Sequence, residues 1–362
     1  MNDAARRVTA TLFLVSLAAS FASFGVVSSL HDVAVHFGRV EPGGSLRNVV
    51  GLSGSVLGLG LGAVRLCSLV ALPITAAADH RGRTSVLRAS LAAGLIVTAL
   101  AAFSPRYWVF VACFALARPL LTTASTLVQV LTVELTATGQ RIHRLVIMAA
   151  GAGVGAGLSA IVHGLIRGGG AFRWLFALAL VPAVALWPLR HAIPEPTRHV
   201  ERSDVARLGS VPRALRGRLA IVATVAFAAG MVTGPSNGFT FVYGEGVLGM
   251  SAGAVAALVT SSALTGLAGL LVGRRLARTR GRRPTVAWGV AATAIAATYA
   301  YSGGRLSFVL GYLVGVGAAG LLAPAASAMS TEVFTHATRA TAAGWAAVAG
   351  VLGATAGLAL FG

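Results

Sequence analysis

Residues Ala78–Arg83 read ADHRGR, and residues Ala277–Arg283 read ARTRGRR. Each of these basic segments separates two long apolar runs, and the glycines Gly82 and Gly281 are 199 residues apart. Glycine permits a tight backbone turn between two helices, so the two segments predict equivalent turns. Because the pattern returns at a fixed offset, we expect a duplicated arrangement of helices.

A second landmark repeats at nearly the same offset. Glu134 precedes Arg141 by seven residues, and Glu332 precedes Arg339 by seven, so the two pairs are 198 residues apart. Two unrelated landmarks with one offset predict a six-helix bundle that occurs twice. The offset places a twelfth helix beyond Gly362, the last residue of the sequence. We therefore expect eleven spans, in a chain that is truncated or incompletely represented.

The composition excludes a soluble globular domain. Hydrophobic residues make up 56% of the 362 residues, charged residues only 11%, and the mean hydropathy is +0.81, whereas soluble domains have about 25% charged residues. Clustered polar residues separate apolar runs of about 20 residues, the helical length that crosses a bilayer. The sequence predicts an all-α polytopic membrane protein, with spans at about 9–30, 49–76, 87–103, 107–133, 145–166, 171–189, 218–241, 252–273, 284–302, 306–330 and 340–362.

Six spans precede a polar, arginine-rich stretch, and five follow it. We predict an N-terminal six-helix bundle at residues 1–189, a cytoplasmic basic linker at 190–217 and a C-terminal bundle at 218–362. The net charge is +19, and all 29 basic residues are arginines, most of them in alternate loops. This positive-inside pattern predicts a multi-pass protein of the cell membrane with a cytoplasmic N-terminus, and no nucleic-acid partner. We expect a monomer in the lipid bilayer that needs no cofactor.

Two arginines fall inside apolar runs. Arg65 precedes Asp79 by 14 residues and Arg118 precedes Glu134 by 16, which places them about 21 and 24 Å from the basic loops by helical rise. A charged side chain at this depth costs about 2.5–3.5 kcal/mol unless it faces a bundle interior or water. We predict that Arg65 and Arg118 line a central cavity; a structural arginine bonded to backbone carbonyls is the alternative for each.

Asn237 is the third candidate for the central cavity. It follows Gly234 and Pro235 in a segment that could unwind and present a side-chain amide, as helices at transporter sites often do. A plain proline kink is the alternative reading of this segment.

The acidic residues are placed differently, because none of the ten lies in the middle of a span. Asp32, at the outer end of the first span, is therefore the best candidate for a proton-coupling group, with a solvated loop aspartate as the alternative. His163, near the outer end of the fifth span, is a weaker candidate, for which a structural histidine is the favoured alternative. The middle of the membrane is thus positive, which predicts an anionic or strongly polar solute; an electroneutral cargo is the alternative.

The basic loops and the linker together resemble the major facilitator superfamily over essentially the whole chain. Residues Thr75–Thr84 read TAAADHRGRT, in which Asp79, Gly82 and Arg83 match the family's G-x-L-A-D-R-x-G-R-[KR] loop and three other positions depart from it. The resemblance implies two six-helix bundles and a cytoplasmic gate loop that latches one bundle to the other. A cluster that only keeps the loop inside is the alternative.

Three further segments bear on the subgroup. PEPTR at Pro194–Arg198 is similar to a signature of sugar and organic-solute porters, and Arg118 matches the arginine of a span-4 motif linked to proton coupling. GAGVGAG at Gly151–Gly157 partly resembles the glycine-rich motif of drug-efflux members, with Ala156 where a proline belongs. The subgroup therefore stays open.

We predict a secondary active transporter that moves a small organic solute by alternating access and is driven by a proton gradient. A drug or metabolite efflux antiporter of the same family, and a non-transporting scaffold or pore, are the alternatives. An enzyme is not expected, because no catalytic constellation lies at bilayer depth and no phosphate-binding loop is present in the sequence.

Overall fold

The computed structural model describes residues 3–38, 51–136, 140–166, 170–182, 192–195, 213–332 and 336–362. All regular structure in these residues is helical, and nine helical segments among them are long and apolar enough to cross a membrane. The chain is thus a multi-pass α-helical membrane protein. It divides into two compact units: unit 1 comprises residues 1–42 and 63–201, and unit 2 comprises residues 43–62 and 202–362.

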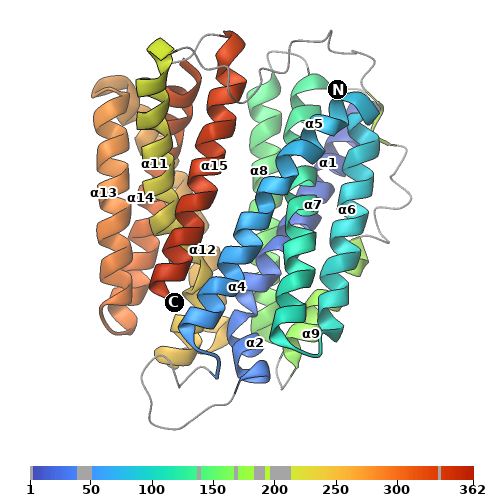
Figure 1. Ribbon diagram of the computed structural model, residues 1–362, viewed down its shortest axis with the longest axis vertical. Helices are drawn as coiled ribbons and strands as arrows, with labels where there is room; N and C mark the ends of the chain where they lie inside the picture. The colour runs from blue at the N-terminus through green and yellow to red at the C-terminus, as the bar shows by residue number, and fades with distance from the viewer. Residues whose placement is uncertain are drawn as a thin grey trace. The chain divides into compact units, whose positions relative to one another are not determined.

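Figure 1 labels the helices of both units. Those of unit 1 are α1 (Asp3–Ser28), α2 (Leu30–Phe37), α5 (Ala71–Arg81), α6 (Arg83–Leu100), α7 (Tyr107–Glu134), α8 (Arg141–Leu165) and α9 (Ala171–Ala177), with 3-10 turns at Ser68–Val70 and Ala101–Phe103. Those of unit 2 are α11 (Arg213–Gly238), α12 (Ala252–Thr279), α13 (Arg282–Tyr301), α14 (Arg305–Glu332) and α15 (His336–Phe361), with a π-helix at Val242–Val247. α4 (Gly54–Cys67) begins in residues that group with unit 2 and ends in unit 1.

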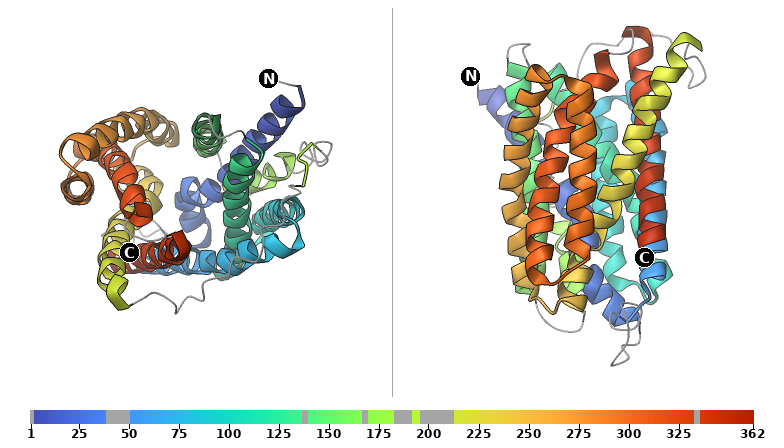
Figure 2. Two further views of the ribbon diagram at one scale, coloured as in Figure 1. Left: turned by 90° about the horizontal axis from the view of Figure 1, so that it is seen from above. Right: turned by 90° about the vertical axis from the view of Figure 1, so that its left-hand side faces the viewer.

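The same pattern of helix packing occurs in each unit. In unit 1, α1 packs along α8, and α7 packs against α6 and α5. In unit 2, α11 packs along α15, and α14 packs against α13 and α12; Figure 2 shows the α12–α14 group and the α11–α15 pair in two views. The helices correspond in chain order, which is the duplication that the loop sequences predict.

Glycines allow the paired helices to approach closely. A Cβ atom on Gly155 of α8 would collide with the carbonyl group of Leu17 on α1, and one on Gly353 of α15 would collide with the carbonyl group of Phe227 on α11. Small residues at helix contacts are typical of membrane proteins, where backbone packing replaces the hydrophobic effect. Gly153, on the same helix as Gly155, has open space instead.

The surface of the helices is apolar as well as the core. The main core of unit 1 joins α1, α6 and α7 through side chains such as Leu12, Leu95 and Leu127. Large aliphatic side chains are nevertheless exposed along the helices, among them Leu165 at 75% and Ile295 at 70%. Such exposure would promote aggregation in water, whereas lipid tails accommodate it.

The helix ends at the first basic segment differ from the predicted span. The second span was predicted to end near residue 76, but α5 continues to Arg81, so Asp79 lies in its last helical turn. The alanines at 76–78 are strong helix formers, which accounts for the extension. Pro73 lacks an N–H group, and the helix passes through the 3-10 turn at Ser68–Val70 just before it.

Other predicted boundaries are not tested by these residues. The spans predicted at 171–189 and 284–302 are not among the nine candidate spans, although residues 171–182 are partly helical and α13 is a helix of 20 residues. The count of eleven and the domain limits therefore stay predictions. Residues 43–62, which the sequence assigns to the first bundle, group with unit 2. Most of the predicted linker lies outside the described residues.

Candidate functional site

The turn between α5 and α6 brings together the gate-loop residues predicted from the sequence. Gly82 joins the two helices with a φ of +92°, a left-handed conformation that favours glycine. α5 therefore ends at Arg81 and α6 begins at Arg83, with the chain reversed between them. We call the end of unit 1 at which α5 ends and α6 begins the charged end; it is at the top of Figure 1.

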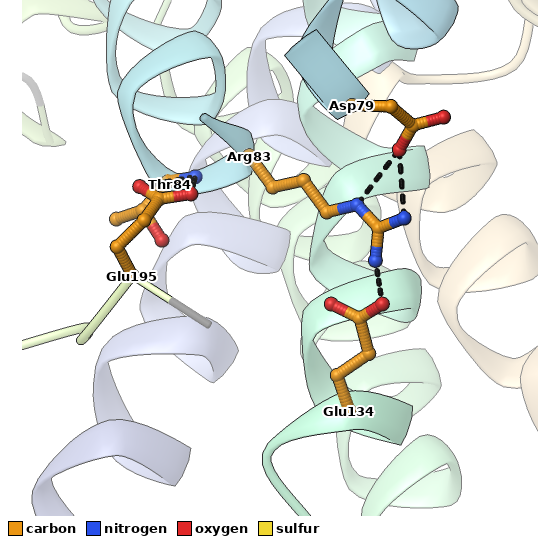
Figure 3. Close-up of polar contacts among 5 residues, drawn as sticks. All are labelled: Asp79, Arg83, Thr84, Glu134 and Glu195. Carbon is orange, nitrogen blue, oxygen red and sulfur yellow. Dashed lines mark hydrogen bonds and ion pairs between the residues drawn. The ribbon is translucent and has the colours of Figure 1, made fainter. Parts of the chain in front are cut away.

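Arg83 connects three elements at this end. Its Nε and Nη2 atoms donate to Oδ1 of Asp79 at 2.9 and 2.7 Å, and its Nη1 atom forms an ion pair with Oε1 of Glu134, the last residue of α7 (Figure 3). The Arg83 side chain is 15% exposed, whereas that of Asp79 is 51% exposed. The sheltered guanidinium thus ties α5, α6 and α7 through two carboxylates.

Glu195 adds a contact that the sequence reasoning did not assign. Both of its carboxylate oxygens lie 3.2 Å from the backbone nitrogen of Thr84, and the Thr84 hydroxyl donates to the carbonyl oxygen of Pro194 at 3.2 Å (Figure 3). A carboxylate at the first turn of a helix accepts from an unpaired N–H group and complements the helix dipole. Pro194 and Glu195, the first two residues of PEPTR, therefore fasten the start of α6, which the resemblance of this segment to a family signature could have indicated.

All five of these side chains belong to unit 1, so the contacts seen are within one bundle. The latch between bundles stays a prediction. In the second copy, Gly281 has the same left-handed φ of +93°, but Arg278 stands where Asp79 stands in the first. The side chains of the second landmark pair, Glu332 and Arg339, lie outside the described ones.

The two arginines predicted for the central cavity both belong to unit 1. Arg118 precedes Pro119 inside α7, and its Nε atom is buried and makes no hydrogen bond to the residues that the structure describes. Arg65 is in the last turn of α4, close enough for its charge to act on Arg118. Two positive charges close together in apolar surroundings repel each other. An anion bound beside them would relieve this repulsion, so the arrangement favours anion binding.

Asp32 and His163 meet at the opposite end of unit 1. Nδ1 of His163 on α8 lies 3.5 Å from Oδ2 of Asp32 on α2, and His163 is only 3% exposed. Earlier along the same two stretches of chain, the Ser28 and Ser159 hydroxyl groups are 3.2 Å apart. The structure thus brings together the two titratable residues that sequence reasoning named separately. Asp32 lies in helix α2, rather than in the loop of the alternative interpretation.

Asn237 remains part of a continuous helix. α11 runs through Pro235 to Gly238, and the Asn237 amide donates to the carbonyl oxygen of Thr233 at 2.9 Å. The structure therefore shows a helical segment at Asn237 and not the unwound one that the sequence suggested. Backbone irregularity follows instead at Val242–Val247, where the Leu248 N–H group donates to the carbonyl oxygen of Tyr243 in a π-helical bond. The sequence did not predict this π-helix, because residues 242–247 lie between two predicted spans and π-helices have no simple sequence signature.

Two duplicated helical units, long apolar helices and a charged turn within each unit are features of a polytopic membrane transporter. The chain belongs to the Major Facilitator Superfamily, which matches residues 12–358. It is therefore a transporter of small solutes and not an enzyme. The matched region includes both basic turns and both candidate arginines.

Solved structures show the same fold. A bacterial homolog of the human lysosomal transporter Spinster, inward-facing and unoccupied, has a TM-score of 0.77 at 15% identity, over 99% of this chain and 82% of that one. The D-xylose-proton symporter has a TM-score of 0.74 at 17% identity, over 96% and 88%. The nucleoside transporter NupG has a TM-score of 0.75 at 14% identity, over 99% and 90%. No curated protein matches the sequence.

Proposed function

We propose that this protein is a secondary carrier that moves a small anionic or strongly polar organic solute by alternating access. Support for an anionic solute comes from the buried Nε atom of Arg118, which has no hydrogen-bond partner among the described residues, and from Arg65, which is close enough for its charge to act on Arg118. No acidic residue occupies the middle of a predicted span, so the sequence offers no fixed counter-ion there. A solute carboxylate or phosphate would neutralise the pair and offset the cost of burying it.

Proton coupling is part of the proposal. Imidazole and carboxylate groups can both carry a proton, and Nδ1 of His163 lies 3.5 Å from Oδ2 of Asp32. The Asp32–His163 pair can therefore take up and release a proton at one end of unit 1. The D-xylose-proton symporter, similar in fold, carries a proton with its solute according to its name.

The proposed orientation follows the charges. With the arginine-rich turns in the cytoplasm, the N-terminus is cytoplasmic and the Asp32–His163 pair faces outward. A single cysteine placed at Thr279, next to the second basic turn, should react with a membrane-impermeant maleimide only after cells are opened. Labelling in intact cells would place the second basic turn outside the cell and contradict the proposed orientation.

A solute screen in proteoliposomes tests the function. Anionic, neutral and cationic solutes should be compared with and without an imposed pH gradient, and anions should be accumulated or expelled with a linked proton flux. Arg118→Gln and Arg65→Gln should each abolish anion transport, with Arg218→Gln, an exposed arginine of α11, as the control. Unchanged anion transport in both variants would overturn the assignment of an anionic solute. The direction of the proton flux relative to the solute flux distinguishes a symporter that imports the solute from an antiporter that exports it.

A further inference from the structure

The second basic turn carries a dense group of exposed arginines. Six arginines lie between residues 274 and 283, at the end of α12, in the turn at Gly281 and at the start of α13. Five of them are exposed and form no ion pair with the residues that the structure describes; we call these five the arginine patch, namely Arg274, Arg275, Arg278, Arg280 and Arg283. The sequence has no acidic residue between Glu245 and Glu332. The patch is therefore positively charged, with no carboxylate close to it along the chain.

The first basic turn has the same backbone conformation but a different charge balance. The φ of Gly82 is +92° and that of Gly281 is +93°. At the first turn, the sheltered guanidinium group of Arg83 pairs with two carboxylates. At the second turn, Arg278 stands where the first has Asp79. The two copies thus share the shape of the turn, and only the second presents its charge to an anionic partner.

The arginine patch begins at the level of the lipid head groups. α12 is a candidate membrane span of 28 residues. A helix of this length is about 42 Å long, which matches the thickness of a bilayer together with its head groups. The last residues of α12, which include Arg274, Arg275 and Arg278, therefore lie among the head groups of one leaflet.

The patch continues an apolar face of the same helix. Leu267 and Leu271 of α12 are 57% and 58% exposed, and Arg275 follows Leu271 by four residues, the spacing of neighbours on one side of a helix. The other side of α12 packs against α14, where a Cβ atom on Gly273 would collide with the carbonyl group of Leu321. The free face thus offers aliphatic side chains first and guanidinium groups next. A phospholipid presents its acyl chains and its phosphate in the same order.

We propose that the arginine patch and the adjoining apolar face of α12 bind anionic phospholipids of the adjacent leaflet. The planar guanidinium groups donate to the lipid phosphate, whose geometry they match, and Leu267 and Leu271 contact the acyl chains. A basic cluster directly beside a membrane span is typical of binding to anionic lipids. A soluble acidic protein would match only the charge, because the apolar face lies within the bilayer. This surface belongs to unit 2, whereas Arg65 and Arg118 of the proposed solute site belong to unit 1.

Lipid binding to the purified full-length protein in detergent tests this surface without a transport measurement. Dioleoyl phosphatidylglycerol and the zwitterionic dioleoyl phosphatidylcholine are added at equal concentration, and native mass spectrometry measures how much of each is bound. We expect the anionic lipid to bind about tenfold more tightly. The preference should shrink when ammonium acetate rises from about 0.1 to about 0.5 M, because salt screens charge contacts. Equal binding of the two lipids, or a preference that salt does not change, would overturn the proposal.

Two variants of equal net charge separate the patch from a general effect of basicity. The patch variant combines Arg274→Gln, Arg275→Gln and Arg278→Gln and should lose the preference for the anionic lipid. The control variant replaces three exposed arginines of unit 1, combining Arg6→Gln, Arg7→Gln and Arg81→Gln, and should keep it. Equal loss in the two variants, or no loss in the patch variant, would overturn the site.

A second patch variant and a soluble competitor complete the test. If the triple patch variant does not fold, Arg280→Gln combined with Arg283→Gln should still weaken binding of the anionic lipid, and unchanged binding would contradict the proposal. Soluble poly-glutamate should not displace the lipid from the parent protein. Binding of poly-glutamate without binding of the anionic lipid would assign the patch to an acidic protein instead. Since solute transport is not measured, failure here leaves the proposed function standing.

Discussion

Arg83, the first residue of α6, forms an ion pair with Glu134, the last residue of α7, while it also holds Asp79 of α5. Three helix ends are thus joined at one guanidinium group. Because that group is mostly sheltered from solvent, its pairing is worth more than the pairing of two fully exposed side chains.

A double-mutant cycle measures this contact. Arg83→Gln and Glu134→Gln should each lower the thermal unfolding midpoint in detergent, and the double variant should lose less than the sum of the two. The expected coupling is about 1 kcal/mol, at the upper end for partly exposed pairs. Additive losses would mean that Arg83 acts through Asp79 alone. Arg218→Gln supplies the control for loss of an exposed arginine.

The two left-handed glycines give a matched comparison. Gly82→Ala and Gly281→Ala place a side chain at nearly the same φ, which costs about 1–2 kcal/mol in each. Only at Gly82 would the new Cβ atom press on a carboxylate, that of Glu195 at 3.2 Å. Hydrogen exchange at the Thr84 amide should therefore accelerate in Gly82→Ala and stay unchanged in Gly281→Ala. The same rate in both would place Glu195 away from α6.

A pair of substitutions on α8 tests the close packing of α1 and α8. Gly155→Val would drive a side chain into the Leu17 carbonyl group, whereas Gly153→Val would enter open space. We expect Gly155→Val to destabilise unit 1 by about 1–3 kcal/mol or more, the usual cost of overpacking, and to reduce folded yield. Gly153→Val should retain the parental midpoint. Equal midpoints would contradict the described register of the two helices.

The pH dependence of transport tests the Asp32–His163 pair. Asp32→Asn removes the carboxylate of the pair, so uptake or release of the coupling proton should fail. Solute exchange without a pH gradient should persist. His163→Gln should likewise uncouple transport from the pH gradient. His36, which lies 3.3 Å from Arg173 at the same end of unit 1, provides the control in His36→Gln. A parental pH profile in both pair variants would exclude this site.

The sequence predicted the fold because its signals are physical and local. Apolar runs of membrane length, glycine turns and a shared offset between landmarks each depend on a few adjacent residues. The depth of Arg65 and Arg118 in the membrane, which follows from the fixed rise of a helix, stays a prediction. Asp79, Gly82 and Arg83 were found because they are neighbours in one turn.

The remaining contacts join segments that are far apart in the sequence. Residue spacing along the chain does not predict such contacts, because they depend on how the helices pack. Glu195 reaches Thr84 only because the chain returns to the charged end after α9, and the pairing of Glu134 with Arg83 depends on how α6 and α7 pack. Glu134 was noticed as part of a repeat with Arg141, whereas Arg141 donates to the Thr136 carbonyl oxygen instead. Arg144, which is only 8% exposed, read as one more basic loop residue, because burial is a property of the packed helices.

The contact between the Thr84 amide and the Glu195 carboxylate has a practical consequence for anyone who labels this transporter. An epitope or fluorophore inserted between Arg81 and Arg83 would separate Thr84 from Glu195 and should lower expression. The turn at Gly281, where an added Cβ atom would meet only Pro284, has room for such an insertion. Reporter groups belong in the second turn.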